Sequence, residues 1–283
     1  MNQRSLKIVF FLSFLLFIIT LWEHSFMGYL KDLVVLFHEI CHALATILTG
    51  GVVEKVAIHN NESGETIAIP SKMKGAFVFI VSSGYIGSSF LGGLVLHRGF
   101  SGKYEKQTLT TLGILLLITT FKFSSSGNLA YTTGIVWGAL FLIVGILNQS
   151  ASAMTLVFIG TLVSLYSVYD LLDFTGNIHH TDAGILAYWF LNISSLKGRP
   201  PGSVMVLSHA IAALWSVVSL SILYFTLKKT FKDESAEEQP ELPIEQFPGE
   251  VTPEVAEWFI SRGLDLNGKP LPQELISELK KEG

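Results

Sequence analysis

The chain has 283 residues, of which 49% are hydrophobic and only 15% are charged, and its mean hydropathy is +0.49. An ordinary soluble domain carries about 25% charged residues, so the composition excludes that class and indicates a polytopic membrane protein. The formal net charge is −4, and many of the acidic residues lie after residue 232. Because the acid is concentrated there, the net charge says little about partners. For a membrane protein we expect the lipid bilayer as a partner, and we expect no nucleic acid.

Seven apolar segments are predicted to cross the bilayer as helices: residues 8–22, 33–48, 75–96, 109–123, 131–147, 154–174 and 204–227. The first follows basic residues as a signal peptide does, but no small-residue cleavage site comes after it, so we expect an uncleaved helix. A shorter apolar segment, residues 181–196, is expected to be re-entrant or interfacial. The predicted fold class is all-α, with about seven transmembrane helices.

Residues 52–74 break this pattern directly after the second apolar segment. Two β-branched runs flank the polar stretch from His59 to Gly64, which predicts a short β-hairpin. An exposed strand edge can pair with an extended peptide without demanding one sequence. A plain extramembrane connector is the alternative, and the residues alone leave both open.

The chain is expected to divide into a membrane domain, residues 1–232, and an acidic tail, residues 233–283, that is soluble and cytoplasmic or otherwise extramembrane. Two short helices are predicted in the tail, around residues 253–262 and 272–281. Basic residues before the first span and lysines after the last one both favour a cytoplasmic position. An odd number of spans cannot place both ends on one side, so either residues 181–196 also cross or one end departs from the charge rule.

His38, Glu39 and His42 form an H-E-x-x-H pattern inside the second apolar segment. Residues four apart share a helix face, so both imidazoles can bind one cation with the glutamate beside it. A catalytic zinc takes three protein ligands and a water molecule, and a neighbouring carboxylate can act as general base. Chance is the alternative, but ionisable residues in so apolar a segment are costly and usually functional.

A third protein ligand has to come from elsewhere in the chain. Asp170 and Asp173 are three residues apart and share a helix face near the end of the 154–174 segment. A further acid, Asp182, follows soon after. Aspartates at helix ends are often caps or solvated groups, which is the alternative for all three.

Small residues mark the third apolar segment. Gly84, Ser88 and Gly92 recur every four residues and allow another helix to approach closely. We expect that partner to be the helix that carries the two histidines.

Together these residues resemble the site-2 protease type of intramembrane zinc metallopeptidase, specifically its smaller site-2-protease-like branch of bacteria and plants. The matching stretches are residues 38–44 with 49–51, 83–88, and 169–173 with 181–183. The resemblance implies zinc bound in the membrane by the two histidines and an aspartate of a later helix. Better-studied members place that aspartate in an Asn-Pro and Leu-Asp-Gly context, which is missing here. Tyr169-Asp170 is what the smaller branch shows, so Asp170 is favoured as third ligand, then Asp173, then Asp182.

The implied activity is that of a zinc metalloendopeptidase in regulated intramembrane proteolysis, with a transmembrane protein as substrate. His38, His42 and Asp170 would hold Zn²⁺, Glu39 would activate water, and no small-molecule cofactor is expected. The alternative is a zinc-binding membrane protein, either a transporter or a proteolytically inactive relative, and Glu39 favours the enzyme because a carrier needs no base. A scaffold that recruits partners through the acidic tail is a further rival. The resemblance suggests a multi-pass protein of the bacterial inner (plasma) membrane.

Overall fold

The computed structural model describes residues 3–61, 63–172, 178–194, 199–237, 253–265 and 269–271. The helices and strands are α1 (Gln3–Leu21), η1 (Ser25–Met27), α2 (Gly28–Leu48), β1 (Val52–Ile58), β2 (Gly64–Ile69), α3 (Ala76–Phe100), α4 (Glu105–Phe123), α5 (Leu129–Leu147), α6 (Gln149–Leu172), η2 (Ile178–His180), α7 (Asp182–Phe190), α8 (Gly202–Glu237) and α9 (Pro253–Ser261). The chain separates into two compact units, residues 1–234 and 235–283. The second unit contains the amphipathic helix α9, whereas the helix expected at 272–281 lies outside the described residues.

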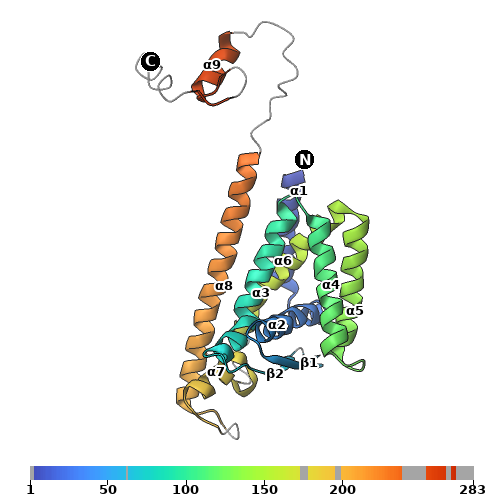
Figure 1. The fold of residues 1–283 in the computed structure, drawn as a ribbon, viewed down its shortest axis with the longest axis vertical. Helices are drawn as coiled ribbons and strands as arrows, with labels where there is room; N and C mark the ends of the chain where they lie inside the picture. The colour runs from blue at the N-terminus through green and yellow to red at the C-terminus, as the bar shows by residue number, and fades with distance from the viewer. Residues whose placement is uncertain are drawn as a thin grey trace. The chain divides into compact units, whose positions relative to one another are not determined.

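The first unit is a bundle in which α3, α4, α5 and α6 run side by side (Figure 1). Small residues let the backbones approach where α4 meets α5 and where α3 meets α6. A methyl group on Gly113 would lie 2.8 Å from the carbonyl oxygen of Gly138, and one on Gly99 would lie 2.7 Å from the amide nitrogen of Val157. Such close approach favours van der Waals packing between helices in lipid, where burial of apolar side chains provides little drive.

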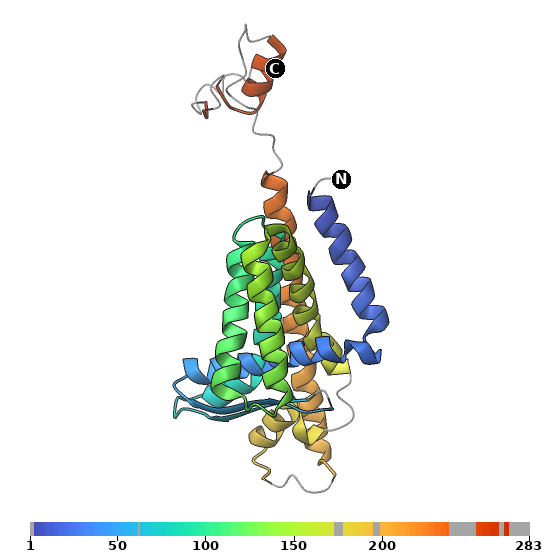
Figure 2. The same cartoon turned by 90° about the vertical axis from the view of Figure 1, so that its right-hand side faces the viewer.

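The helix α2 lies across the long helices instead of along them (Figure 2). The chain bends by 119° between residues 5–21 and residues 25–48, at a break directly before η1. Side chains from Asp32 to Ala43 of α2 are all buried, so this apolar helix is surrounded by protein. A long apolar segment is buried in a large core or in a membrane, and hydropathy alone does not separate the two.

Among the described residues, four helices are long and apolar enough to cross a membrane, or five if the bent pair α1 and α2 counts as one span. The four are α3, α5, α8 and residues 149–166 of α6. The protein is thus a mostly helical membrane protein with a small two-stranded sheet, and the expected count of seven spans is not confirmed. The helix α1 begins, and α8 ends, at the same end of the bundle (Figures 1 and 2), so one orientation can satisfy the basic residues near both ends.

The predicted hairpin is confirmed as an antiparallel pair of β1 and β2 beside α2 (Figure 2). Val56 lies opposite Thr66 and Ile58 opposite Gly64. The outer edge of β1 is occupied by the connection between α4 and α5. Ser124 Oγ donates a hydrogen bond to the carbonyl oxygen of Val56, and the amide of Ile58 donates to Asn128 Oδ1.

Candidate metal centre

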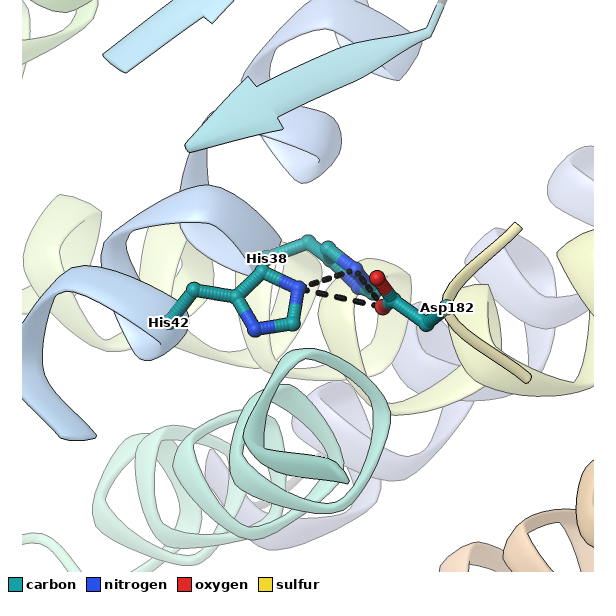
Figure 3. A group of neighbouring side chains, drawn as sticks. All are labelled: His38, His42 and Asp182. Atoms are coloured by element: carbon teal, nitrogen blue, oxygen red, sulfur yellow. Dashed lines mark hydrogen bonds and ion pairs between the residues drawn. The ribbon is translucent and has the colours of Figure 1, made fainter. Parts of the chain in front are cut away.

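The H-E-x-x-H residues lie on the buried middle of α2. His38, Glu39 and His42 are each only 5–6% exposed. The two imidazoles project from the same side of the helix, as their spacing predicts (Figure 3), and their Nε2 atoms are 3.1 Å apart. Two ionisable rings held this close inside an apolar core have to be stabilised by a partner.

That partner is Asp182, the first residue of α7 (Figure 3). Its Oδ2 lies 3.0 Å from Nε2 of His38 and 3.0 Å from Nε2 of His42. Thr181 sets the start of α7, because its hydroxyl accepts a hydrogen bond from the amide of Gly184. This cap fixes the direction in which Asp182 leaves the helix.

The electrostatics favour an ionised carboxylate at this position. Burial by itself raises the pKa of Asp182, but when no metal is bound the protonated imidazoles of His42 and His38 more than offset burial and hold that pKa well below its usual range. Asp182 is therefore an anion at neutral pH, which is the form that binds a cation.

The three atoms have the spacing and chemistry that a zinc ion requires. Each residue offers one ligand atom, and among the described residues these atoms form a group compact enough to hold a metal. Two ligands bound to one tetrahedral zinc at about 2.0–2.1 Å are about 3.3 Å apart, slightly more than the edges of this triangle. The donor set of two imidazoles and one carboxylate also matches that of catalytic zinc sites, which leave a fourth position open.

Gly84 of α3 leaves free the space next to the two imidazoles. A Cβ atom at this position would overlap Nε2 of His38 and Nε2 of His42. The expected packing of α3 on the histidine helix is therefore found at Gly84, and Gly87 likewise faces Cys41 of α2. Gly92 differs, because its Cα lies against Ser164 of α6 and not against α2.

The second ring nitrogen of each histidine is buried. Nδ1 of His42 is 2.7 Å from the carbonyl oxygen of Ile80, which as an acceptor keeps the proton on Nδ1 and leaves the Nε2 lone pair for the site. Nδ1 of His38 has no hydrogen-bond partner among the described residues. The rings of Tyr85 and Tyr166 meet the His38 ring edge-on, with centroids 4.7 and 5.7 Å away. The Nδ1 side of the His38 ring is therefore held by aromatic packing, whereas its Nε2 side meets Asp182.

Glu39 faces the hairpin. Thr66 Oγ1 donates a hydrogen bond to Oε2 of Glu39 over 2.6 Å, and Gly64 lies directly against the same carboxylate. Sequence reasoning did not identify Thr66, Gly64 or Ile80 as site residues. For Thr66 and Gly64, the sequence feature that could have indicated a role in the site is the position of the hairpin directly after the histidine helix.

The structure brings Asp182 to the histidines. In the sequence analysis this aspartate ranks third among the candidates for the third metal ligand. Asp170 belongs to α6, but its side chain lies outside the described residues, as does the whole of Asp173. The assignment of a metal-binding role to Asp170 or Asp173 therefore stays a prediction.

Comparison with known proteins identifies the family. The family model described as Peptidase M50B-like matches residues 11–226, about three quarters of the chain. The protein belongs to this family, which confirms the site-2 protease-like resemblance and makes the chain an integral membrane protein of a metallopeptidase family. No curated protein and no solved structure matches the chain significantly.

Proposed function

We propose that the protein is a zinc-dependent intramembrane endopeptidase in which His38, His42 and Asp182 bind the metal and Glu39 is the general base. One observation carries the proposal: Asp182, at least 140 positions from both histidines in sequence, places its Oδ2 3.0 Å from each Nε2 atom, and these two atoms are 3.1 Å apart. We prefer Asp182 to Asp170 as third ligand because, among the described residues, its carboxylate lies beside both imidazoles.

Zinc supplies Lewis-acid chemistry when bound, since it polarises a carbonyl group and lowers the pKa of a water molecule to about 7. The residues of the chain supply the rest. The carboxylate of Glu39 accepts a proton from the attacking water and delivers it to the leaving amine. The buried surroundings of α2 exclude bulk water and strengthen each of these interactions. The hydrogen bond between Thr66 and Glu39 favours the enzyme over a simple metal carrier, because a carrier has no need of an oriented base.

The substrate chemistry follows from the edge of β2. Transmembrane helices hide their carbonyl groups in hydrogen bonds, so a substrate has to be extended before it can be cut. The backbone groups of Val56 and Ile58 point away from β2 towards Ser124 and Asn128. In an antiparallel pair, two residues directly opposite each other either exchange backbone hydrogen bonds or both point their backbone groups outwards. Val56 and Ile58 point outwards, so their partners Thr66 and Gly64 also point their backbone groups away from β1.

The alternation of β2 places the backbone groups of Ala68 on this outer edge as well. Within the described residues the edge formed by Gly64, Thr66 and Ala68 has no second strand, since the sheet contains β1 and β2 alone. It lies next to Glu39. We expect an unwound stretch of a transmembrane protein to pair there as an added strand. The membrane concerned is proposed to be a bacterial inner membrane.

Zinc content tests the metal site. The protein purified in detergent is compared with His38→Ala, Asp182→Asn, Asp170→Asn and Glu39→Gln by elemental analysis. We expect about one zinc per chain in the wild type, Asp170→Asn and Glu39→Gln, and loss of zinc in the other two. Loss in Asp170→Asn with retention in Asp182→Asn would transfer the third ligand to Asp170. A folded wild type without zinc would remove the hydrolase proposal.

Cleavage tests the activity and the edge. A panel of fluorogenic single-span peptides with helix-breaking residues at the centre is reconstituted with the protein in lipid vesicles. The probe is a peptide cut by the wild type and left intact by Glu39→Gln. Ala68→Pro removes one edge amide, whereas Ala68→Gly keeps it and serves as the control. We expect KM to rise in the proline variant only, and equal KM values in both would contradict strand addition.

A further inference from the structure

Thr66 connects the hairpin to the proposed general base. Its Oγ1 lies 2.6 Å from Oε2 of Glu39 and 3.1 Å from the backbone carbonyl oxygen of Glu39. A hydroxyl has one proton to donate, and the shorter distance is that of a charge-assisted bond to a carboxylate. The Thr66 hydroxyl therefore fixes one of the two carboxylate oxygens.

Gly64 lies against the other oxygen. A Cβ atom at this position would overlap Oε1 of Glu39 and would lie 2.7 Å from its carboxyl carbon. A residue without a side chain is therefore needed here for the carboxylate to keep its place. Gly64 and Thr66 are two positions apart on β2 and so share the face of the hairpin that meets α2.

The same two residues direct their backbone groups to the free edge of β2. Side chains stand roughly perpendicular to a sheet, whereas backbone donors and acceptors lie in its plane. One residue can therefore contact Glu39 and pair with a peptide at the same time. A peptide added to this edge would add backbone hydrogen bonds to β2. These bonds would restrain β2 further, together with the Thr66 hydroxyl that already contacts Glu39.

We propose that Thr66 is a positioning residue that couples substrate pairing on the edge of β2 to the alignment of the Glu39 carboxylate. This inference rests on the proposed function. The side chain of Thr66 does not touch the reacting atoms and acts through Glu39. An added strand would restrain β2 and so hold the Glu39 carboxylate more firmly, which links hydrolysis to a substrate that has already unwound.

Three variants test this proposal in full-length protein. Thr66→Val keeps the shape of the side chain and removes the donor, Thr66→Ser keeps the donor, and Ile67→Val is a matched change on the opposite, exposed face of β2. The measurements are kcat and KM on the probe peptide, zinc per chain, and the affinity for a peptide hydroxamate, whose hydroxyl proton is accepted by the base carboxylate. The hydroxamate reports on the position of Glu39 without requiring turnover.

We expect Thr66→Val to lower kcat about 10- to 100-fold, the range for loss of a hydrogen bond to a charged group, with KM and zinc content unchanged. Hydroxamate affinity should fall with kcat, and Thr66→Ser should restore most of both. Wild-type kcat in Thr66→Val, or an equal loss in Thr66→Ser, would overturn the coupling. If the wild type binds zinc but cuts no peptide, the proposed function fails, and the hydroxamate affinities still decide the role of Thr66.

Discussion

Replacement of Gly84 by alanine should weaken metal binding severely while leaving the fold intact. The added Cβ would overlap Nε2 of both His38 and His42, and these atoms are the far ends of side chains that can rotate away. Restoring van der Waals separation requires each ring to retreat by about 1 Å. Metal–ligand distances tolerate deviations of only about 0.2 Å, so the displacement is about five times what ligation allows.

The assay is zinc affinity, measured by competition with a chelator, alongside helix content and thermal unfolding of the same samples. We expect affinity to fall at least ~100-fold in Gly84→Ala, more than the loss of an outer-shell partner causes. The matched control is Gly87→Ala on the same helix, because its Cβ would lie 3.2 Å from Cβ of Cys41 and would touch no histidine. Wild-type zinc affinity in a folded Gly84→Ala protein would refute the geometry of the site.

Three further predictions concern the surroundings of the site and the far end of the bundle. Thr181→Ala removes the cap of α7 and should cost about 1 kcal/mol of helix stability. Zinc binding should also weaken, because Asp182 loses its support. Thr181→Ser keeps the cap and should restore both the stability and the zinc affinity, measured by thermal unfolding and zinc titration. Lys7 and Glu105 form a buried pair, with Nζ and Oε1 3.8 Å apart, beside a cavity of about 400 Å³. Glu105→Gln alone should lower stability by about 3 kcal/mol in thermal melts, because it leaves the charge of Lys7 buried without a partner. Adding Lys7→Met removes that charge and should recover part of the loss. A double variant no more stable than Glu105→Gln would argue against a buried charge. A zinc chelator should stop cleavage of the probe peptide, and added zinc should restore it; undiminished cleavage in chelator would contradict a metal-dependent reaction.

The amino-acid sequence by itself determined the features that depend on neighbouring residues. His38, Glu39 and His42 lie within one helical turn, so their shared face follows from helix geometry without any tertiary contact. The hairpin likewise follows from a turn sequence between two β-branched runs. The assignment to membrane proteins follows from the composition, which is a property of the whole chain and does not depend on where the residues lie in space.

Hydropathy could not decide how α2 is placed. A segment as apolar as residues 33–48 can be buried in protein or exposed to lipid, so its hydropathy predicts a helix that spans the bilayer. Only the tertiary structure shows the 119° bend after α1 and the surrounding helices and hairpin.

The completion of the site was decided by contacts between distant segments. Asp182 reaches the histidines because α7 packs against α3, which in turn packs against α2. Gly84 and Thr66 gain their significance only where α3 and β2 meet α2. Sequence spacing carries no information about which of several aspartates a fold brings to a given point, and that choice therefore belongs to the packing of α2, α3 and α7.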